Sequence, residues 1–252
     1  MAIPIFVINL DRHVARLAHM RSVLSGLVFA RIAAVEGGAL ADDGGPLTPF
    51  ERACLASHRL VWRRLIDSGE PCACVLEDDL HLSPGFGPLM SDPGWIPADA
   101  HVVKIDTYFQ TVLLGEQRPV LPGLDLARLW SRHQSSAAYV ITRAGAARYL
   151  DRTAIPTLPA DYALFPKNPR KAGLAIYQLT PAVALQDHLR PAEAGGQIFP
   201  TGMGGAPKPR LRALARLTRE GRRLVGQTAD LAETAWLRGR LGATPSIVGV
   251  QD

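Results

Sequence analysis

The residues best suited to chemistry in this 252-residue chain are three consecutive carboxylates, Glu77, Asp78 and Asp79. They follow the apolar residues 72–76, which predict a short buried strand. Because side chains alternate along a strand, we expect Glu77 and Asp79 to face one side and Asp78 the other. Two converging carboxylates repel each other unless a cation lies between them, and Mg²⁺ or Mn²⁺ is the hard ion that oxygen ligands and substrate phosphates hold together. The alternative is an acidic turn that leads into a helix near residue 83.

The elements that would position these carboxylates alternate between strand-like and helix-like segments. Apolar stretches predict strands at residues 3–10, 29–35, 72–76, 101–105, 137–142 and 176–186, and helices at 14–24, 48–67 and 143–151. This alternation is typical of an α/β fold with a mainly parallel sheet. Ligands bind such sheets beyond the carboxyl ends of the strands. Polar residues follow four of the predicted strands and are expected on one rim: Asn9, Glu36, Glu77 to Asp79, and Asp106.

Several protein classes lack their sequence signatures here. The chain has neither a Walker loop nor a Gly-x-Gly-x-x-Gly after the first strand nor a Gly-x-Ser-x-Gly elbow, which disfavours P-loop ATPases, Rossmann dehydrogenases and serine hydrolases. Three cysteines, Cys54, Cys72 and Cys74, are too few for a disulfide framework and are expected to be buried, unreactive thiols. No run of 18 apolar residues and no basic region before an apolar stretch at the N-terminus occur, which predicts a cytoplasmic protein.

The net charge of +5 is concentrated near the end of the chain. Residues 1–205 contain 19 basic and 19 acidic residues, whereas residues 206–252 contain nine basic and four acidic ones. Residues 1–205 are thus neutral and are not expected to bind nucleic acid; within the chain we expect a domain at 1–191, a Gly/Pro-rich linker at 192–210 and a basic, helical tail at 211–252. Lys208, Arg212, Arg216, Arg219 and Arg223 would form one basic helix face. Such a helix either binds the inner-membrane surface or docks its leucines on the body.

Short motifs along the chain resemble those of a known family. In order they are Val7-Ile8-Asn9-Leu10-x-Arg12 with Arg16, Ala34-x-Glu36-Gly37, Glu51 with Ser57-His58 and Trp62, Leu76 to Asp79, Ala138 to Ile141, and Pro181 with Gln186-Asp187. The sequence over roughly residues 3 to 190 resembles glycosyltransferase family 25, the lipooligosaccharide-biosynthesis galactosyltransferases and their collagen-modifying relatives.

The resemblance implies a fold, a donor and a reaction. It implies a Rossmann-like single domain of the GT-A type, a UDP-sugar donor, Mn²⁺ (or Mg²⁺), and inverting transfer of a hexose, galactose, to a lipopolysaccharide or related glycan. Glu77-x-Asp79 would then be the DxD-type motif, with Glu in place of its first Asp. Asp79 would bind the metal, and Glu77 or Asp78 would face the ribose or sugar. The rivals are a non-catalytic nucleotide-sugar or glycan-binding module and a transferase that acts on protein.

The resemblance also suggests roles for single residues. Asp161 is expected to be the base that takes the proton of the acceptor hydroxyl, with a helix N-cap as the alternative role and Asp106 as the next candidate base. His188 is favoured over Asp187 as a second metal ligand. The residues expected to line the donor site are Asn9, Arg12, Arg16, Glu36, Ser57, His58, Glu77 and Asp78. For Arg12 and Arg16 the alternative is a solvated helix face, and for His58 it is packing within a helix.

Overall fold

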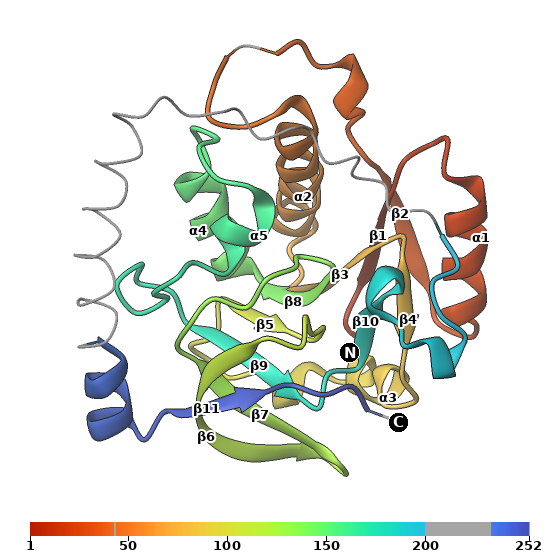
Figure 1. Cartoon of the computed structure of the whole chain (residues 1–252). Coiled ribbons are helices and arrows are strands. Elements are labelled where there is room, and N and C mark those ends of the chain that lie inside the picture. Colours follow the sequence, from red (N-terminus) through yellow and green to blue (C-terminus); the bar gives the residue numbers. More distant parts are fainter. Residues whose placement is uncertain (43, 200–232, 252) are drawn as a thin grey trace.

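The computed structural model describes residues 1–42, 44–199 and 233–251, and Figure 1 shows the arrangement of their elements. Within these ranges, nine strands form one sheet in the order β11-β6-β7-β9-β5-β8-β3-β1-β2. Their bounds are β1 Ile5–Asn9, β2 Phe29–Ala33, β3 Cys72–Glu77, β5 Val102–Lys104, β6 Thr111–Leu121, β7 Leu124–Leu129, β8 Ala138–Thr142, β9 Ile176–Thr180 and β11 Thr244–Ile247. A separate antiparallel pair joins β4 (Leu80–Leu82) to β10 (Ala184–Gln186).

The sheet is mixed, so the prediction of a mainly parallel sheet is wrong. Among the eight neighbouring pairs of the described sheet, three are parallel (β1 with β2, β1 with β3, and β5 with β9) and five are antiparallel. One cause is the hairpin of β6 and β7, whose turn contains Gly123 in the left-handed region at a φ of 74°. A tight turn of this kind can join only antiparallel strands. The α/β class itself is confirmed.

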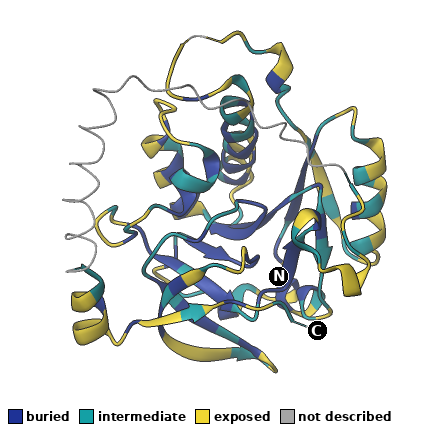
Figure 2. Cartoon of the chain, viewed as in Figure 1, coloured by how far each residue is buried: buried dark blue, intermediate teal, exposed yellow. Residues whose placement is uncertain are grey.

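Helices cover both faces of the sheet, as Figures 1 and 2 show. The helices are α1 Val14–Val23, α2 Pro49–Ser68, α3 Phe86–Ser91, α4 Arg143–Arg152 and α5 Ala160–Leu164. Alternate residues of β1 divide between two apolar cores: Phe6 and Ile8 pack with residues of α2, α4 and α5, whereas Ile5 and Val7 pack with residues of α1 and α3. Burial on both faces explains why β1 reads as an almost unbroken apolar run.

The start of α2 follows from its local sequence. The Thr48 hydroxyl accepts a hydrogen bond from the Glu51 backbone N–H, and the Glu51 carboxylate accepts one from the Thr48 N–H at 2.8 Å. Pro49 occupies the first helical position, where no intrahelical N–H bond is lost. The helix ends at Gly69, which adopts a left-handed φ of 75°. This helix carries Cys54, His58 and Trp62 at intervals of four residues, and therefore on one face.

The last residues belong to the body and not to a separate helical tail. Residues 233–241 are helical, but β11 pairs with β6 and extends the main sheet. Val248 is fully buried, and the Ala182 backbone N–H donates to the Gly249 carbonyl at 2.8 Å. The predicted tail at 211–252 is therefore wrong for its final part, because apolar residues there complete the core. The predicted basic face of Lys208 to Arg223 lies outside the described residues.

Deleting residues 243–252 is expected to destabilise the protein by at least about 3 kcal/mol and to lower Tm by roughly 6–12 °C. The deletion removes the buried Val248 side chain and exposes the edge of β6. Differential scanning calorimetry would measure the change. A matched pair tests the cause: Val248→Ala should lower Tm, whereas Ile247→Ala, at a side chain 65% exposed, should not. An unchanged Tm in the deletion variant would contradict the assignment of β11 to the sheet.

Candidate functional site

The acidic motif lies at the end of β3: Glu77 is the last residue of the strand, and Asp78 and Asp79 lie in the bend that leads to β4, so the predicted strand alternation does not extend to Asp79. The Gln186 side-chain amide nitrogen lies 3.4 Å from Glu77 Oε2 and 3.4 Å from Asp79 Oδ1, so these two carboxylates converge on one group. Asp78 accepts a hydrogen bond from Asn9 Nδ2 at 2.7 Å. The acidic-turn alternative is correct for the backbone of Asp78 and Asp79, and the convergence of Glu77 and Asp79 on Gln186 is a further feature of that bend. Gln186 belongs to one of the family-like motifs, but sequence reasoning assigned it no role.

The surroundings of Asp79 stabilise a negative charge on its carboxyl group only in part. Burial and the neighbouring Glu77 charge raise the pKa of Asp79 from 3.8 to about 7, against the opposing effect of Arg16. Arg16 Nη1 lies 3.1 Å from a carboxylate oxygen of Asp79 and 3.1 Å from one of Asp78. The solvated alternative for Arg16 is therefore wrong. A cation bound near Asp79 would offset the remaining charge.

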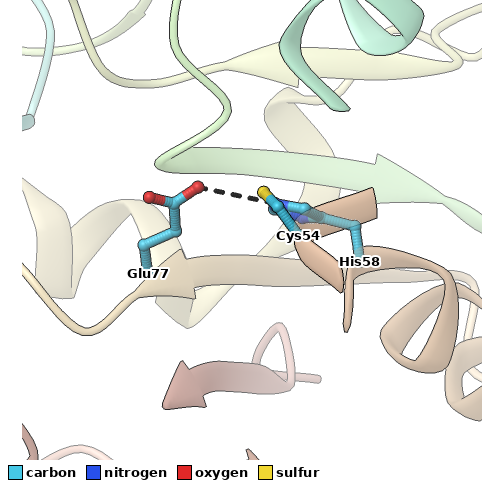
Figure 3. A group of neighbouring side chains, drawn as sticks. All are labelled: Cys54, His58 and Glu77. Atoms are coloured by element: carbon cyan, nitrogen blue, oxygen red, sulfur yellow. Dashed lines mark ion pairs between the residues drawn. The ribbon is translucent and has the colours of Figure 1, made fainter. Parts of the chain in front are cut away.

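Glu77 contacts a hydroxyl and an imidazole from two other segments of the chain. Ser136 Oγ donates to Glu77 Oε1 at 3.1 Å, and His58 Nε2 lies 3.4 Å from the same oxygen. Figure 3 shows Cys54 and His58 directed from α2 toward Glu77 at the end of β3. Burial raises the pKa of Glu77, but the contacts with His58, Ser136 and Lys104 outweigh it and hold the pKa below its ordinary value. Glu77 is therefore ionised near neutral pH.

A buried ion pair lies beside the carboxylates. Lys104 and Asp106 are both fully buried, and Lys104 Nζ donates to Asp106 Oδ1 at 2.6 Å and to the Ser135 carbonyl at 2.7 Å. The Ser135 hydroxyl contacts Asp106 Oδ2 at 2.6 Å, and Ser135 holds a left-handed φ of 79°, which costs backbone energy in a residue with a Cβ. Because Asp106 is enclosed and paired, it cannot reach an acceptor hydroxyl. The next candidate base is thus excluded by its position.

Asp161 lies in the first turn of α5 and is half-buried. Pro159 occupies the N-cap position, so the N-cap alternative for Asp161 is wrong. Burial raises the pKa of Asp161, while the charges of Lys104 and Arg132 oppose the shift and that of Glu77 adds to it. Asp161 therefore belongs to the same electrostatic cluster as Glu77 and Lys104. A raised pKa suits a general base.

Several predicted donor-site residues have structural contacts instead. Asn9 is buried, donates to Asp78 and accepts from Arg31 Nε at 2.8 Å. Ser57 is also buried; its hydroxyl donates to the Ala53 carbonyl and accepts from the Val35 N–H, each at 2.8 Å. These groups position the ends of β1 and β2. Their hydrogen-bonding groups are directed to protein partners and not to an open site.

Two further predicted residues form an exposed ion pair. Arg12 and Glu36 contact each other at the surface, with side chains 50% and 42% exposed. They lie beyond β1 and β2 and remain accessible to a ligand. Among the described residues, their side-chain hydrogen bond and ion pair are with each other, at the surface.

The segment after β10 approaches Asp79 through its backbone. The Asp187 N–H donates to the Asp79 carbonyl at 2.8 Å, but the buried Asp187 carboxylate turns to His81, at 2.8 Å, and to the N–H groups of Ile198 and Phe199. His188 is exposed, and its ring lies 6.0 Å from the ring of Tyr108. The role of His188 as a metal ligand remains a prediction. Of residues 186–188, Gln186 is the one whose side chain contacts Glu77 and Asp79.

The side-chain atoms near Glu77 can be compared with the oxygen ligands that the predicted Mn²⁺ or Mg²⁺ prefers. Within the described ranges, Cys54, His58 and Glu77 have ligand atoms within 4.8 Å of one another. This mixed set differs from the predicted site at Asp79. Burial, together with nearby acidic charges, raises the pKa of Cys54 far above its ordinary value and so opposes the thiolate that a metal would need. The oxygens of Glu77 and Asp79, in contrast, fit a hard divalent ion that phosphates would complete.

The fold and the site together define an α/β protein with a carboxylate-lined centre at the ends of its strands. The model of glycosyltransferase family 25, described as an LPS biosynthesis protein, matches residues 2–164. The chain belongs to this family, which confirms the resemblance inferred from the ordered motifs.

Individual relatives match part of the chain. The chain is 30% identical over 151 residues to the lacto-N-neotetraose biosynthesis glycosyltransferase LgtB of Neisseria gonorrhoeae, with 56% of this chain and 54% of the relative covered. It is 28% identical over 153 residues to the lipooligosaccharide biosynthesis protein lex-1 of Haemophilus influenzae, with 56% and 50% covered. The chain thus spans about half the length of the curated relatives it matches.

A solved structure shows weaker similarity. It is a glycosyltransferase involved in glycosylation of the major capsid of PBCV-1, with 9% identity, coverage of 77% of this chain and 97% of that one, and a TM-score of 0.43. At this level the similarity carries no functional argument.

Proposed function

We propose that the protein is a metal-dependent glycosyltransferase. It would transfer galactose, which is a hexose, from a UDP-sugar to a lipooligosaccharide or related glycan. The transfer would invert the configuration at the anomeric carbon. The observation that carries the proposal is the convergence of Glu77 and Asp79 at the end of β3 in a chain of family 25, where the Glu77 charge also acts on Asp161. The names of the relatives, which refer to lacto-N-neotetraose and lipooligosaccharide biosynthesis, support the choice of acceptor class.

Each carboxylate has its own role in the proposed reaction. Asp79 would hold Mn²⁺ or Mg²⁺, which when bound neutralises charge on the diphosphate leaving group. Glu77 would contact the ribose or sugar; Asp78 is less suited because Asn9 and Arg16 already contact it. Arg16 adds a fixed positive charge beside the diphosphate site.

Asp161 would accept the proton of the acceptor hydroxyl. As that proton transfers to the carboxylate, the acceptor oxygen bonds to the anomeric carbon from the face opposite the leaving group. The bond between the anomeric carbon and the phosphate oxygen breaks, and UDP departs with the electron pair. One bond forms and one breaks at carbon, which inverts its configuration. The raised pKa of Asp161 makes the carboxylate a stronger base than an exposed aspartate.

The cellular location follows from the proposed acceptor. No helix among the described residues is long and apolar enough to cross a bilayer. We propose that the protein acts in the cytoplasm at the inner-membrane surface, where a lipid-anchored acceptor would be available. The basic spacing from Lys208 to Arg223 supports this location, since each basic residue near anionic lipid contributes about 1 kcal/mol.

A donor panel would test the proposed function. We expect one of UDP-galactose, UDP-glucose and UDP-N-acetylglucosamine to raise Tm in the presence of Mn²⁺ and not in the presence of chelator. The same donor should be hydrolysed slowly, releasing UDP that a coupled assay detects. If no UDP-sugar shifts Tm with metal present, the proposal is wrong. Binding without hydrolysis or transfer to lactose-type acceptors would instead indicate a non-catalytic nucleotide-sugar-binding module.

A further inference from the structure

A line of buried polar side chains connects α2, β8 and β3 and ends on Glu77. Trp62 Nε1 lies 2.9 Å from the Tyr139 hydroxyl oxygen, which lies 2.9 Å from His58 Nδ1. His58 Nε2 then lies 3.4 Å from Glu77 Oε1. Trp62 and Tyr139 are fully buried and His58 is 1% exposed, so water does not compete for these contacts. The hydrogen bonds must be satisfied within the line itself.

The number of protons on each side chain determines which atom donates in each hydrogen bond of the line. An indole N–H can only donate, so the Tyr139 oxygen accepts from Trp62. The Tyr139 hydroxyl has one proton, and among the described residues its remaining hydrogen-bond contact is His58 Nδ1. Tyr139 therefore donates to Nδ1, which must be unprotonated. The ring proton of His58 is then on Nε2, which faces Glu77 Oε1.

We propose that His58 is a positioning residue for Glu77, held in its Nε2–H tautomer by Tyr139 and Trp62. The functional part of this inference rests on the proposed function, in which Glu77 contacts the donor. Glu77 Oε1 accepts a hydrogen bond from Ser136 and lies 3.4 Å from His58 Nε2. The other oxygen, Oε2, faces Gln186, whose amide nitrogen is equally far from Asp79. The line thus fixes which carboxylate oxygen is presented to the donor.

A metal ion held by Cys54, His58 and Glu77 is the competing interpretation of the same cluster (Figure 3). A metal on His58 Nε2 would move the ring proton to Nδ1, which would then donate to the Tyr139 oxygen. That oxygen already accepts from Trp62, and the Tyr139 hydroxyl proton would lose its acceptor among the described residues. An enclosed donor without an acceptor costs about 1–3 kcal/mol. The hydrogen-bonded arrangement satisfies every group in the line.

The tautomer can be measured on the full chain without any activity. In ¹⁵N-histidine-labelled protein, we expect His58 to show a protonated Nε2 and an unprotonated Nδ1, with its signals assigned by their loss in His58→Gln. Tyr139→Phe removes the donor to Nδ1 and should move the Nδ1 signal toward that of an unprotonated imidazole nitrogen without a hydrogen bond. Tyr149→Phe is the matched control, because this buried tyrosine contacts Trp62 through its ring but donates to the Leu164 carbonyl. It should leave the His58 signals unchanged.

Kinetics test the positioning role. His58→Gln keeps an N–H near the Nε2 position and should retain kcat within about 3-fold, whereas His58→Asn, whose amide lies near Nδ1, should lose about 10–100-fold. Tyr139→Phe should lower kcat more than Tyr149→Phe at a similar loss of Tm, with the KM for acceptor unchanged in all four variants. The Mn²⁺–UDP affinity of each variant should be measured beside the rates.

The possible outcomes separate this inference from the proposed function. A protonated Nδ1, or one equivalent of zinc in the purified protein that is lost in Cys54→Ser, would overturn the tautomer and favour the metal interpretation. Equal effects of Tyr139→Phe and Tyr149→Phe on kcat would mean that the line only stabilises the fold. If the wild-type protein neither binds Mn²⁺–UDP nor turns over donor, the proposed function fails and the positioning role fails with it. The NMR result would still report the tautomer in that case.

Discussion

Asp79→Asn is expected to weaken Mn²⁺-dependent UDP binding by at least about 100-fold, or about 2.7 kcal/mol, while the protein stays folded. The substitution removes the charge that would hold the cation but keeps the size of the side chain. It also relieves the repulsion with Glu77 that helps to raise the pKa of Asp79, so Tm should not fall substantially. Titration calorimetry with Mn²⁺ and UDP would measure the affinity.

Asp78→Asn is the matched control for Asp79→Asn. Asp78 accepts from Asn9 Nδ2 and from the same Arg16 nitrogen that contacts Asp79, so its carboxylate is already occupied within the protein. Its substitution should lower Tm through these lost contacts and weaken Mn²⁺–UDP binding less than Asp79→Asn does. Unchanged affinity in Asp79→Asn, or a larger loss in Asp78→Asn, would refute the assignment of the cation to Asp79.

The same assignment predicts a pH dependence in the wild-type protein. Because the pKa of Asp79 is about 7, the carboxyl group is mostly protonated below that pH and mostly ionised above it. A cation must displace the proton, so Mn²⁺–UDP affinity should fall about tenfold for each pH unit below about 7 and level off above it. A flat profile between about pH 6 and about pH 8 would show that Asp79 does not bind the cation.

Asp161→Asn is expected to reduce the transfer rate by about 10²–10⁴-fold and to change donor affinity by only a few-fold. The amide cannot accept the proton of the acceptor hydroxyl, whereas it should leave the Glu77 and Asp79 end of the site in place. Rates of transfer to a soluble acceptor and Mn²⁺–UDP-sugar affinities would be measured on the same preparation. A near-wild-type rate would assign the base elsewhere.

Asp106→Asn distinguishes a base from a structural carboxylate. This substitution leaves Lys104 buried without its counter-charge, which typically costs about 3–5 kcal/mol of stability. We therefore expect a large fall in Tm for Asp106→Asn and a small one for Asp161→Asn, whose side chain is half-buried. A variant of Asp106 that stays as stable as wild type but loses transfer would reverse the two roles.

Most of the local structure was predictable from the sequence because its signals act over a few residues. The capping box of Thr48 and Glu51 specifies the start of α2, and the apolar run before Glu77 specifies β3. The alternation predicted for Glu77 and Asp79 does not hold, because β3 ends at Glu77 and Asp79 lies in the bend that follows. The hairpin of β6 and β7 was not predicted, because Gly115 and Pro119 interrupt its apolar pattern.

By itself, the sequence determined the α/β class, the family and the acidic motif at the end of β3, since each depends on residue types in a short or ordered pattern. Only the tertiary structure decided which groups contact that motif. Gln186 reaches Glu77 across 109 positions, and Tyr139 reaches His58 across 81. Such contacts depend on strand register and on the order of strands in the sheet, which place β8 beside β3 and β11 beside β6. Local periodicity carries no information about that order, because it specifies which face of an element is buried and not the neighbour that buries it.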